Sequence, residues 1–185
     1  MTLQSKLPDI DDTALMIQAR DDDENAFAEL VRRHQKKLLN FFIRAGVQYD
    51  CEDLVQQTFL RLYRYRKRYV TSAKFTTFLF LLARQVWIDE LRRRKRRERL
   101  IEGYSAEPLA GHSAPRSVHA AVAGSMDLEQ AMASLPEGMR QVVELGVYQD
   151  LPYAEVSKIL GIPVGTVKSR MFTALRKLRE FLEKP

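Results

Sequence analysis

Six consecutive basic residues give one segment of this sequence a clear chemical character. They run from Arg92 to Arg97 and follow a stretch that is itself rich in cations. On a helix, like charges one turn apart repel by roughly 0.2–0.5 kcal/mol per pair, so a bound anion stabilises such a segment. A nucleic-acid backbone is the polyanion that fits it. A solvated helix end is the alternative, and the basic surroundings favour phosphate.

Aromatic and basic residues alternate upstream of this run. Aromatic faces flanked by cations can stack on unpaired bases and hold them. Phe59, Phe75 and Phe78 fall on apolar stripes and are expected in a core, whereas Tyr65, Phe80 and Trp87 sit at stripe edges and are open to either role. Residues 70–73 between two expected helices could receive a base turned out of its stack. The full series is Tyr63, Tyr65, Tyr69, Phe75, Phe78, Phe80 and Trp87, interleaved with Arg61, Arg64, Arg66, Lys67, Arg68, Lys74 and Arg84.

The sequence has no pattern typical of a catalytic or metal site. The three histidines, His34, His112 and His119, form no pair at helical spacing. There is no glycine-rich phosphate loop, and the single cysteine, Cys51, excludes an intramolecular disulfide and a multi-cysteine metal site. The acidic run Asp21–Glu24 could bind a divalent ion, but acids before a helix are usually solvated. We therefore expect no enzyme, no catalytic or metal-binding residues and no cofactor.

The charge is divided unevenly along the chain. The 185 residues carry a net charge of +6, but residues 31–101 hold 19 basic and six acidic residues, a net +13, whereas residues 1–30 carry a net −6. A cationic block of this kind is expected of a protein that binds nucleic acid. Residues 1–9 lack the basic and apolar regions of a leader, and the longest near-apolar run is about half a membrane span. We expect a cytoplasmic protein.

The apolar spacing predicts a bundle of helices over residues 12–101. Asp12 is expected to cap a short helix, and a second helix has a stripe over residues 27–45 and ends at Gly46. Asp50 is expected to cap a third helix, and a fourth starts near Lys74 and continues into the basic run. Its expected buried stripe is Phe75, Phe78, Leu79, Leu82, Ala83, Val86 and Leu91. No segment alternates like a strand, so the expected fold class is all-α.

Residues 102–125 are predicted to be a flexible linker, because they are rich in glycine, proline and serine and have no apolar period. A coil of this length spans roughly 27 Å root-mean-square and at most roughly 80 Å. Two folded units could therefore bind well-separated parts of one long ligand.

Residues 126–185 are predicted to form a second, smaller helical domain. Proline and glycine divide it into helices over 126–134, 136–148 and 153–160 and a last helix starting at Pro163. The last two, joined by a tight turn, form a helix-turn-helix whose second helix fits a DNA major groove. We expect it to bury Val167, Met171, Ala174, Leu175, Leu178 and Leu182, and to expose Thr166, Lys168, Ser169, Arg170, Phe172, Thr173 and Arg176.

Three stretches of the chain together resemble one known family. The first is residues 26–34 with 53–62, the second is residues 75–92, and the third is residues 153–156 with 160–170. In this order they resemble the extracytoplasmic-function (ECF) sigma factors, the two-domain sigma subunits of bacterial RNA polymerase. The resemblance covers nearly the whole chain. It implies that residues 12–101 are sigma region 2 and that residues 126–185 are sigma region 4.

The resemblance also implies roles for individual residues. One helix face that would otherwise be interpreted as solvated becomes the contact with core polymerase, through its beta-prime coiled coil: Asp53, Gln56, Gln57, Phe59 and Arg61. The residues expected to melt and bind the minus-ten element are Tyr69, Ser72, Lys74, Arg84, Gln85, Trp87, Asp89, Arg92 and Arg93. Those expected to read the minus-35 element are Thr166, Lys168, Ser169, Arg170, Phe172 and Thr173.

The chain departs from the family pattern at a few positions. Phe78 stands where the family usually has Trp, Gln85 where it has Asn, and Thr173–Leu175 replaces an Arg-Ala-Arg continuation. The base preferences of the family are therefore not transferred to this chain.

The function expected from the sequence is promoter-specific transcription initiation. The partners are core RNA polymerase, including its beta subunit, promoter DNA, and an anti-sigma factor that holds the idle protein. A stand-alone helix-turn-helix regulator remains the alternative, although such regulators usually dimerise on two half-sites. A nuclease would explain the charge but lacks a visible metal or acid–base constellation.

Overall fold

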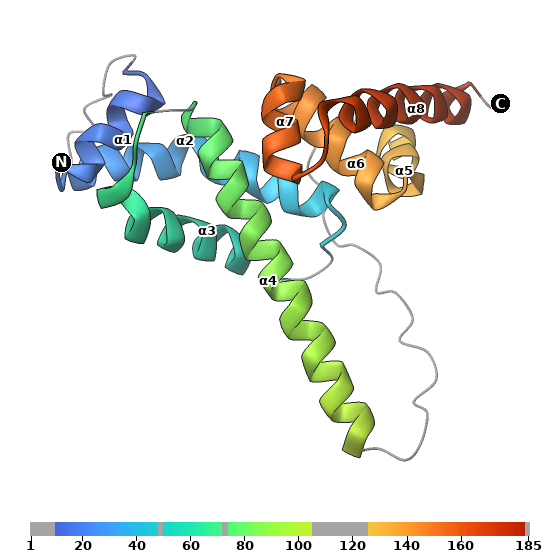
Figure 1. The fold of residues 1–185 in the computed structure, drawn as a ribbon, viewed down its shortest axis with the longest axis horizontal. Helices are drawn as coiled ribbons and strands as arrows, with labels where there is room; N and C mark the ends of the chain where they lie inside the picture. Colours follow the sequence, from blue (N-terminus) through green and yellow to red (C-terminus); the bar gives the residue numbers. More distant parts are fainter. Residues whose placement is uncertain (1–9, 48–49, 72–73, 105–125, 184–185) are drawn as a thin grey trace.

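The computed structural model describes residues 10–47, 50–71, 74–104 and 126–183, and within these ranges the regular structure is entirely helical (Figure 1). The expected all-α class is therefore confirmed for the part of the chain that the structure describes. The N-terminal helices are α1 (Asp12–Arg20), α2 (Glu24–Arg44), α3 (Cys51–Tyr65), the 3₁₀ turn η1 (Arg66–Arg68) and α4 (Phe75–Tyr104). The C-terminal ones are α5 (Met126–Ser134), α6 (Glu137–Val143), the π-helical turn η2 (Glu144–Tyr148), α7 (Tyr153–Leu160) and α8 (Val164–Leu182).

Helix α4 continues beyond the predicted end of the first domain. It reaches Tyr104, whereas the linker was predicted to begin at residue 102. The rest of the predicted linker, residues 105–125, lies outside the described residues.

Two predicted helix caps differ in the structure. The cap of α1 is Asp11, whose carboxylate accepts a hydrogen bond from the backbone of Thr13 at 3.1 Å. Asp12, the predicted cap, binds α2 side chains instead. Asp50 does precede α3, but it adopts a left-handed conformation and makes no side-chain cap. Its carboxylate lies 3.3 Å from the guanidinium of Arg94 on α4, which draws it away from the α3 backbone.

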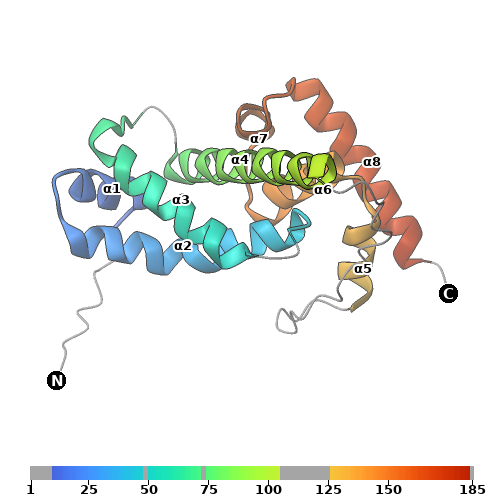
Figure 2. The same ribbon diagram turned by 90° about the horizontal axis from the view of Figure 1, so that it is seen from below.

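Helix α4 lies at the centre of the molecule, with α1, α2 and α3 on one side and α6, α7 and α8 on the other (Figure 2). Its N-terminal half is buried on more than one face, since Phe80 and Trp87 are only 1% and 6% exposed in addition to the predicted stripe. The C-terminal half projects beyond the other helices (Figure 1), and Leu91, predicted to be buried, is 38% exposed.

A buried histidine joins α1 to α2. The His34 ring is 1% exposed, its Nε2 lies 2.7 Å from an Asp12 carboxylate oxygen, and its centroid lies 5.2 Å from that of the tilted Phe75 ring of α4. Arg33 reinforces the junction, because its guanidinium donates to Asp12 at 3.1 Å and to the carbonyl of Ile10 at 2.7 Å. The N-terminal helix is thus held by polar contacts in addition to its apolar side chains.

The turn between α7 and α8 has the geometry that a helix-turn-helix requires. Gly161 ends α7 in the left-handed region, at φ 63°. The Ser157 hydroxyl donates to the carbonyl of Ile162 at 2.6 Å and fixes the turn from the preceding helix. Helix α8 then buries four of the six residues predicted for its stripe: Val167, Met171, Ala174 and Leu178.

Leu175 and Leu182, also predicted to be buried, are each 48% exposed. They line an open apolar groove of about 520 Å³ between α5, the α6–η2 segment and α8. The stripe is therefore narrower than predicted, because the other helices of this domain leave one edge of α8 uncovered.

We predict that His34 makes stability depend on pH. Burial lowers the pKa of His34 below its usual value of 6.5, and the nearby Asp12 carboxylate offsets only part of this effect. A lowered pKa in the folded state means that the unfolded chain binds the proton more readily. Stability present above about pH 6.5 is therefore lost as the pH falls. Urea denaturation between pH 7.5 and 5.5 should show a falling midpoint.

The His34→Gln variant should show a much flatter profile over the same range, even though its stability at pH 7.5 is lower. An equally steep decline in this variant would assign the pH dependence to other groups.

We predict that Gly161→Ala destabilises the helix-turn-helix without any steric clash. Nothing lies within 4 Å of the position that a Cβ would occupy, so the cost is that of a left-handed alanine, about 1–2 kcal/mol. Gly165→Ala is the matched control, because its Cβ would also meet open space but its backbone is helical. Thermal unfolding should show a lower Tm for the first variant and an equal or higher Tm for the second. Equal losses in both would contradict the conformational explanation.

Candidate polymerase and nucleic-acid interface

The outer face of α3 carries the residues predicted to contact polymerase. Asp53 and Gln56 are exposed, and Gln57 and Arg61 are partly exposed. Phe59 is only 7% exposed, because it shares the inward stripe of Val55 and Leu62. Its ring supports this surface from beneath and is not available to a partner in this structure.

Leu60 was not singled out from the sequence, yet it is 56% exposed and lies one helical turn from Gln56. The α3 face therefore combines polar groups with one large apolar side chain. The sequence did contain a signal for this exposure, because Leu60 is an apolar residue out of phase with the buried stripe of α3.

Side-chain contacts join this face to α4. The Arg61 guanidinium lies 3.0 Å from the carboxylate of Asp89, and Arg93 donates to the side-chain oxygen of Gln57 at 3.3 Å. Each contact pairs a residue predicted to bind polymerase with one predicted to bind the minus-ten element. The structure thus brings the two predicted sites together as neighbouring parts of one surface.

The predicted minus-ten residues divide into exposed and buried groups. Gln85 is exposed, as are three cations, Lys74, Arg92 and Arg93. Arg84 is half-buried, and its desolvation lowers the pKa of its guanidinium. Ser72 lies outside the described residues.

Tyr69 and Trp87, predicted to hold bases, are 5% and 6% exposed. The Tyr69 ring packs against Phe78 at a centroid distance of 5.5 Å, and burial raises the pKa of its hydroxyl. Phe80, which the sequence left open between core and platform, contacts Phe41 at 5.3 Å inside the core. None of these three rings offers a free face to a base in this structure.

The basic run extends as an exposed helical arm. Between residues 92 and 100 only Arg94 is partly buried. Glu90 forms ion pairs with three of the cations: its carboxylate lies 2.9 Å from Arg93, 3.0 Å from Arg94 and 3.6 Å from Arg97. Asp89 and Asp50 pair with Arg92 and Arg94, and Glu98 lies within the run, but the cations outnumber these carboxylates. The arm therefore stays positive, as phosphate binding requires.

The exposed face of α8 presents most of the residues predicted to read DNA. Lys168, Ser169 and Phe172 are exposed, with Phe172 at 72%, and Thr166 and Thr173 are partly exposed. The Ser169 hydroxyl donates to the carbonyl of Thr166 at 3.1 Å, which holds it close to the helix.

Arg170 is partly buried and lies against α6. A Cβ built on Gly138 would be 2.9 Å from its Nη1 atom. In this conformation the Arg170 guanidinium lies against Gly138 of α6 and not on the exposed face of α8. The Gly138 position allows that close approach.

Sequence reasoning missed the contact between the two halves of the chain. Arg44 at the end of α2 lies 3.3 Å from the carboxylate of Glu144, which is fully buried in η2. The signal was present, because Glu144 is the one acid within the apolar stretch 142–147. Among the described residues no group of His, Cys, Asp and Glu side chains could hold a metal ion, and no helix is long and apolar enough to cross a bilayer.

Comparison with known families agrees with this arrangement. The model of Sigma-70 region 2 matches residues 30–97, and the model of Sigma-70 region 4 matches residues 125–178. These ranges cover the α2–α4 bundle with its basic arm, and the helix-turn-helix domain.

Two curated relatives cover most of the chain. The chain is 35% identical over 159 residues to the ECF RNA polymerase sigma factor SigE of Mycolicibacterium smegmatis; the match covers 84% of this chain and 61% of that relative. It is 33% identical over 174 residues to the ECF RNA polymerase sigma factor RpoE of Cereibacter sphaeroides, with 91% and 93% covered.

The fold is also found among solved structures. The sigma factor RpoE of Bartonella quintana, solved in complex with the anti-sigma factor NepR, matches with a TM-score of 0.67 at 24% identity, covering 85% of this chain and 96% of that one. With both sigma regions in order and relatives of this similarity, the chain belongs to the ECF RNA polymerase sigma factors, the non-enzymatic subunits that direct RNA polymerase to promoters.

Proposed function

We propose a division of labour between two domains of this sigma factor. Residues 12–101 bind core polymerase and open the minus-ten element, residues 126–185 read the minus-35 element, and residues 102–125 link them. The observation that carries the proposal is the adjacency of the α3 face and the basic side of α4, tied by Arg61 and Asp89 at 3.0 Å. A polymerase bound to α3 would thereby lie beside the DNA bound to α4.

The polymerase contact is proposed for the exposed part of the α3 face. Asp53 and Gln56 supply polar groups to the beta-prime coiled coil, Leu60 supplies the apolar centre, and Gln57 and Arg61 flank it. Interfaces of this type combine a small apolar centre with a polar rim. The beta subunit is the second polymerase partner that we propose.

On the minus-ten side, we propose that the free energy of binding the unpaired strand offsets the cost of melting the duplex. We propose that Lys74, Arg92 and Arg93 hold the backbone while Gln85 contacts bases, with Arg84 and Asp89 at the margin of the surface. Ser72, outside the described residues, stays a predicted member of the set. Tyr69 and Trp87 contribute a stacking face only if they become uncovered. Each base stacked on a side chain contributes about 1–3 kcal/mol, which offsets the loss of roughly 1.4 kcal/mol of stacking per base-pair step.

On the minus-35 side, the exposed face of α8 enters the major groove. We propose that Lys168 contacts phosphate or a base edge and that Phe172 packs on a thymine methyl group, the apolar feature of that groove. Thr166, Ser169 and Thr173 lie near Lys168 and Phe172 on α8, and we propose that their hydroxyls form hydrogen bonds with the DNA. Arg170 would have to swing away from Gly138 to reach DNA.

We also propose that an anti-sigma factor binds this chain in the cytoplasm when it is idle. A related fold, the RpoE of Bartonella quintana, has been solved with such a partner. The net charge of +13 on residues 31–101 supports the proposal, because it would otherwise promote non-specific DNA binding.

We predict that polymerase binding depends on the exposed polar side chains of the α3 face. The double variant Asp53→Ala, Gln56→Ala should lose stable co-elution with bacterial core RNA polymerase on a sizing column. Both side chains are exposed, so the fold should be unchanged. The control is Gln35→Ala, which removes an exposed amide from α2.

Circular dichroism should show equal helicity in the three proteins. Co-elution of the double variant at the wild-type level would contradict the assigned surface. If the folded wild-type chain failed to co-elute as well, the stand-alone DNA-binding regulator would be the better account.

We predict that Lys168 and Phe172 of α8 make different contributions, the first through charge and the second through base reading. In reconstituted holoenzyme, Lys168→Ala should weaken binding to all promoter variants alike and reduce the salt slope by about 1 if it contacts a phosphate. Phe172→Ala should instead relax the preference for thymine at one minus-35 position, at a cost of about 1–3 kcal/mol on the preferred sequence. Binding titrations at several salt concentrations measure both effects. Lys177→Ala, another exposed cation of α8, is the control.

A Phe172 variant with an unchanged sequence preference would remove this residue from the proposed reading surface. A salt slope lowered as much by the Lys177 variant as by the Lys168 variant would show that the charge effect is not local.

A further inference from the structure

We propose that the free chain holds itself closed through a buried ion pair between Arg44 and Glu144, and that this closed form cannot occupy both promoter elements at once. The second part rests on the proposed function. The first part concerns only the contact between the two halves of the chain.

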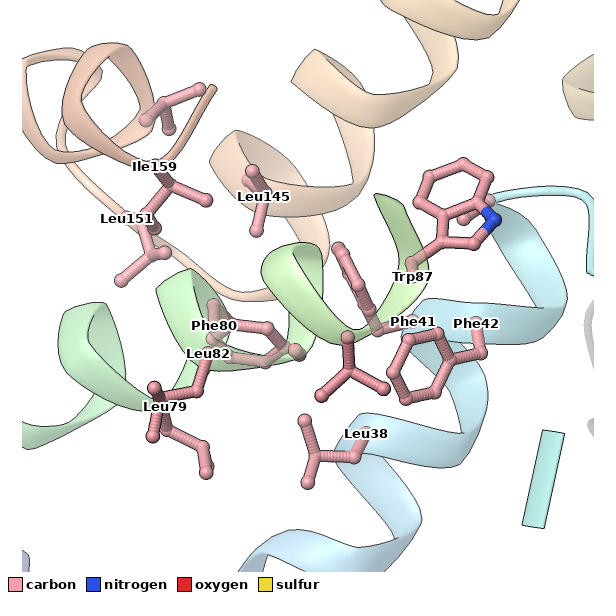
Figure 3. Close-up of a cluster of buried hydrophobic side chains, with 14 of the residues drawn as sticks. Leu38, Phe41, Phe42, Leu79, Phe80, Leu82, Trp87, Leu145, Leu151 and Ile159 are labelled. Atoms are coloured by element: carbon pink, nitrogen blue, oxygen red, sulfur yellow. The ribbon is translucent and has the colours of Figure 1, made fainter. Parts of the chain in front are cut away.

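An apolar cluster forms the body of this contact. Figure 3 shows Leu38 and Phe41 of α2 and Phe80 of α4 gathered with Leu145 and Leu151 from the C-terminal half. All five side chains are at most 5% exposed. Removing such side chains from water on both sides of a contact favours its closure.

Polar contacts fix the position of the two halves. The Arg44 guanidinium lies 3.3 Å from Glu144 and stacks on the ring of Tyr148, with its carbon 3.9 Å from the ring centroid. Gln149 donates to the other Glu144 carboxylate oxygen at 2.9 Å. Arg44 is therefore the cation that compensates a buried negative charge from across the contact.

Two further contacts depend on the same placement. Arg140 of α6 lies against Gly46, where a Cβ would be 3.2 Å from its Nη1 atom. The Thr77 hydroxyl of α4 donates to the carboxylate of Glu155 on α7. Contacts thus reach from the end of α2 to the start of α4.

The closed form conflicts with the geometry of a promoter. The two elements are named for positions about 25 base pairs apart, which corresponds to roughly 85 Å of DNA at 3.4 Å per step. Helix α7 packs directly on α4, and packed helices lie 8–10 Å apart, so α8 begins within about 20 Å of α4. One closed chain can therefore reach one element but not the other.

Closure also covers one side of the N-terminal half of α4. Thr77, three residues after Lys74, is 3% exposed where the carboxylate of Glu155 binds its hydroxyl. Opening would return this side of α4 to solvent. Lys74, Gln85, Arg92 and Arg93 are exposed even in the closed form, so closure prevents simultaneous binding of both elements and does not by itself block DNA binding by α4.

The buried ion pair allows the proposal to be tested by removing one charge or both. Removing one partner of a buried pair leaves an uncompensated charge, whereas replacing both by neutral residues of similar size is often tolerated. Arg44→Met should therefore open the chain, and the double variant Arg44→Met, Glu144→Gln should close it again. Arg32→Met is the matched control, because Arg32 pairs with Glu29 within α2 at 2.6 Å.

The measurement is energy transfer between dyes on two introduced cysteines, Arg64→Cys and Lys177→Cys, in the full chain without polymerase or DNA. Both positions are exposed. Cys51 should stay unlabelled, because it is buried and burial raises the pKa of its thiol to about 11.

Wild type, the Arg32 control and the double variant should show one narrow distribution of short distances. Arg44→Met should reduce that population at least about tenfold and shift the mean outward by about 20 Å, as a linker of this length allows. Circular dichroism should show unchanged helicity in every protein.

A broad distribution in the wild type, an unshifted Arg44→Met variant, or a double variant that stays open would each overturn the proposal. None of these results would bear on promoter-specific transcription, which is measured separately with core polymerase. Conversely, failure of transcription with a closed wild type would count against the proposed function and not against the ion-pair lock.

Discussion

The burial of the N-terminal half of α4 is the constraint on which the other features of this structure depend. Between Phe75 and Trp87 this helix packs against α2 and α3 on one side and against α7 on the other (Figure 2). A fully buried large apolar side chain contributes about 1.5–3 kcal/mol, and this segment supplies several of them. The two halves of the chain are therefore organised around one helix.

The same helix changes character along its length. Its first half is apolar and enclosed, while residues 92–100 form a cationic arm whose charge Glu90, Asp50 and Asp89 neutralise in part. An apolar half anchors the helix in the fold, and a charged half projects it toward a polyanion. Under the function proposed above, the charge offered to promoter DNA would lie next to the α3 face offered to polymerase.

Much of this architecture could be predicted from local sequence patterns. Apolar spacing, Gly161 and the prolines before α6, α7 and α8 located the helices, because these signals act over a few residues. The burial of α4 on a second face, at Phe80 and Trp87, could not be predicted from such local signals. Trp87 and Phe80 lie at the edge of a stripe that is complete within the first domain, and only the packed helices around them decide whether they are covered.

The exposed residues of the candidate site could be predicted from the sequence, but not all of the buried ones. Exposed residues of the α3 and α8 faces follow from helical period, since the side opposite a buried stripe meets solvent. Phe59 was assigned to binding by family resemblance, although its position on an apolar stripe favoured the core, where the structure places it. Tyr69, assigned to binding in the same way, is buried as well. Arg44 and Glu144 lie 100 residues apart, and no local pattern pairs them.

The closed form that we propose cannot occupy both promoter elements at once. Energy transfer within the dye-labelled chain, recorded before and after assembly with core polymerase and promoter DNA, tests it most directly. The account predicts a short distance in the free chain and an increase of tens of ångströms, toward the roughly 85 Å between the two elements, in the complex. A distance that stays short while the same complex initiates transcription would contradict it.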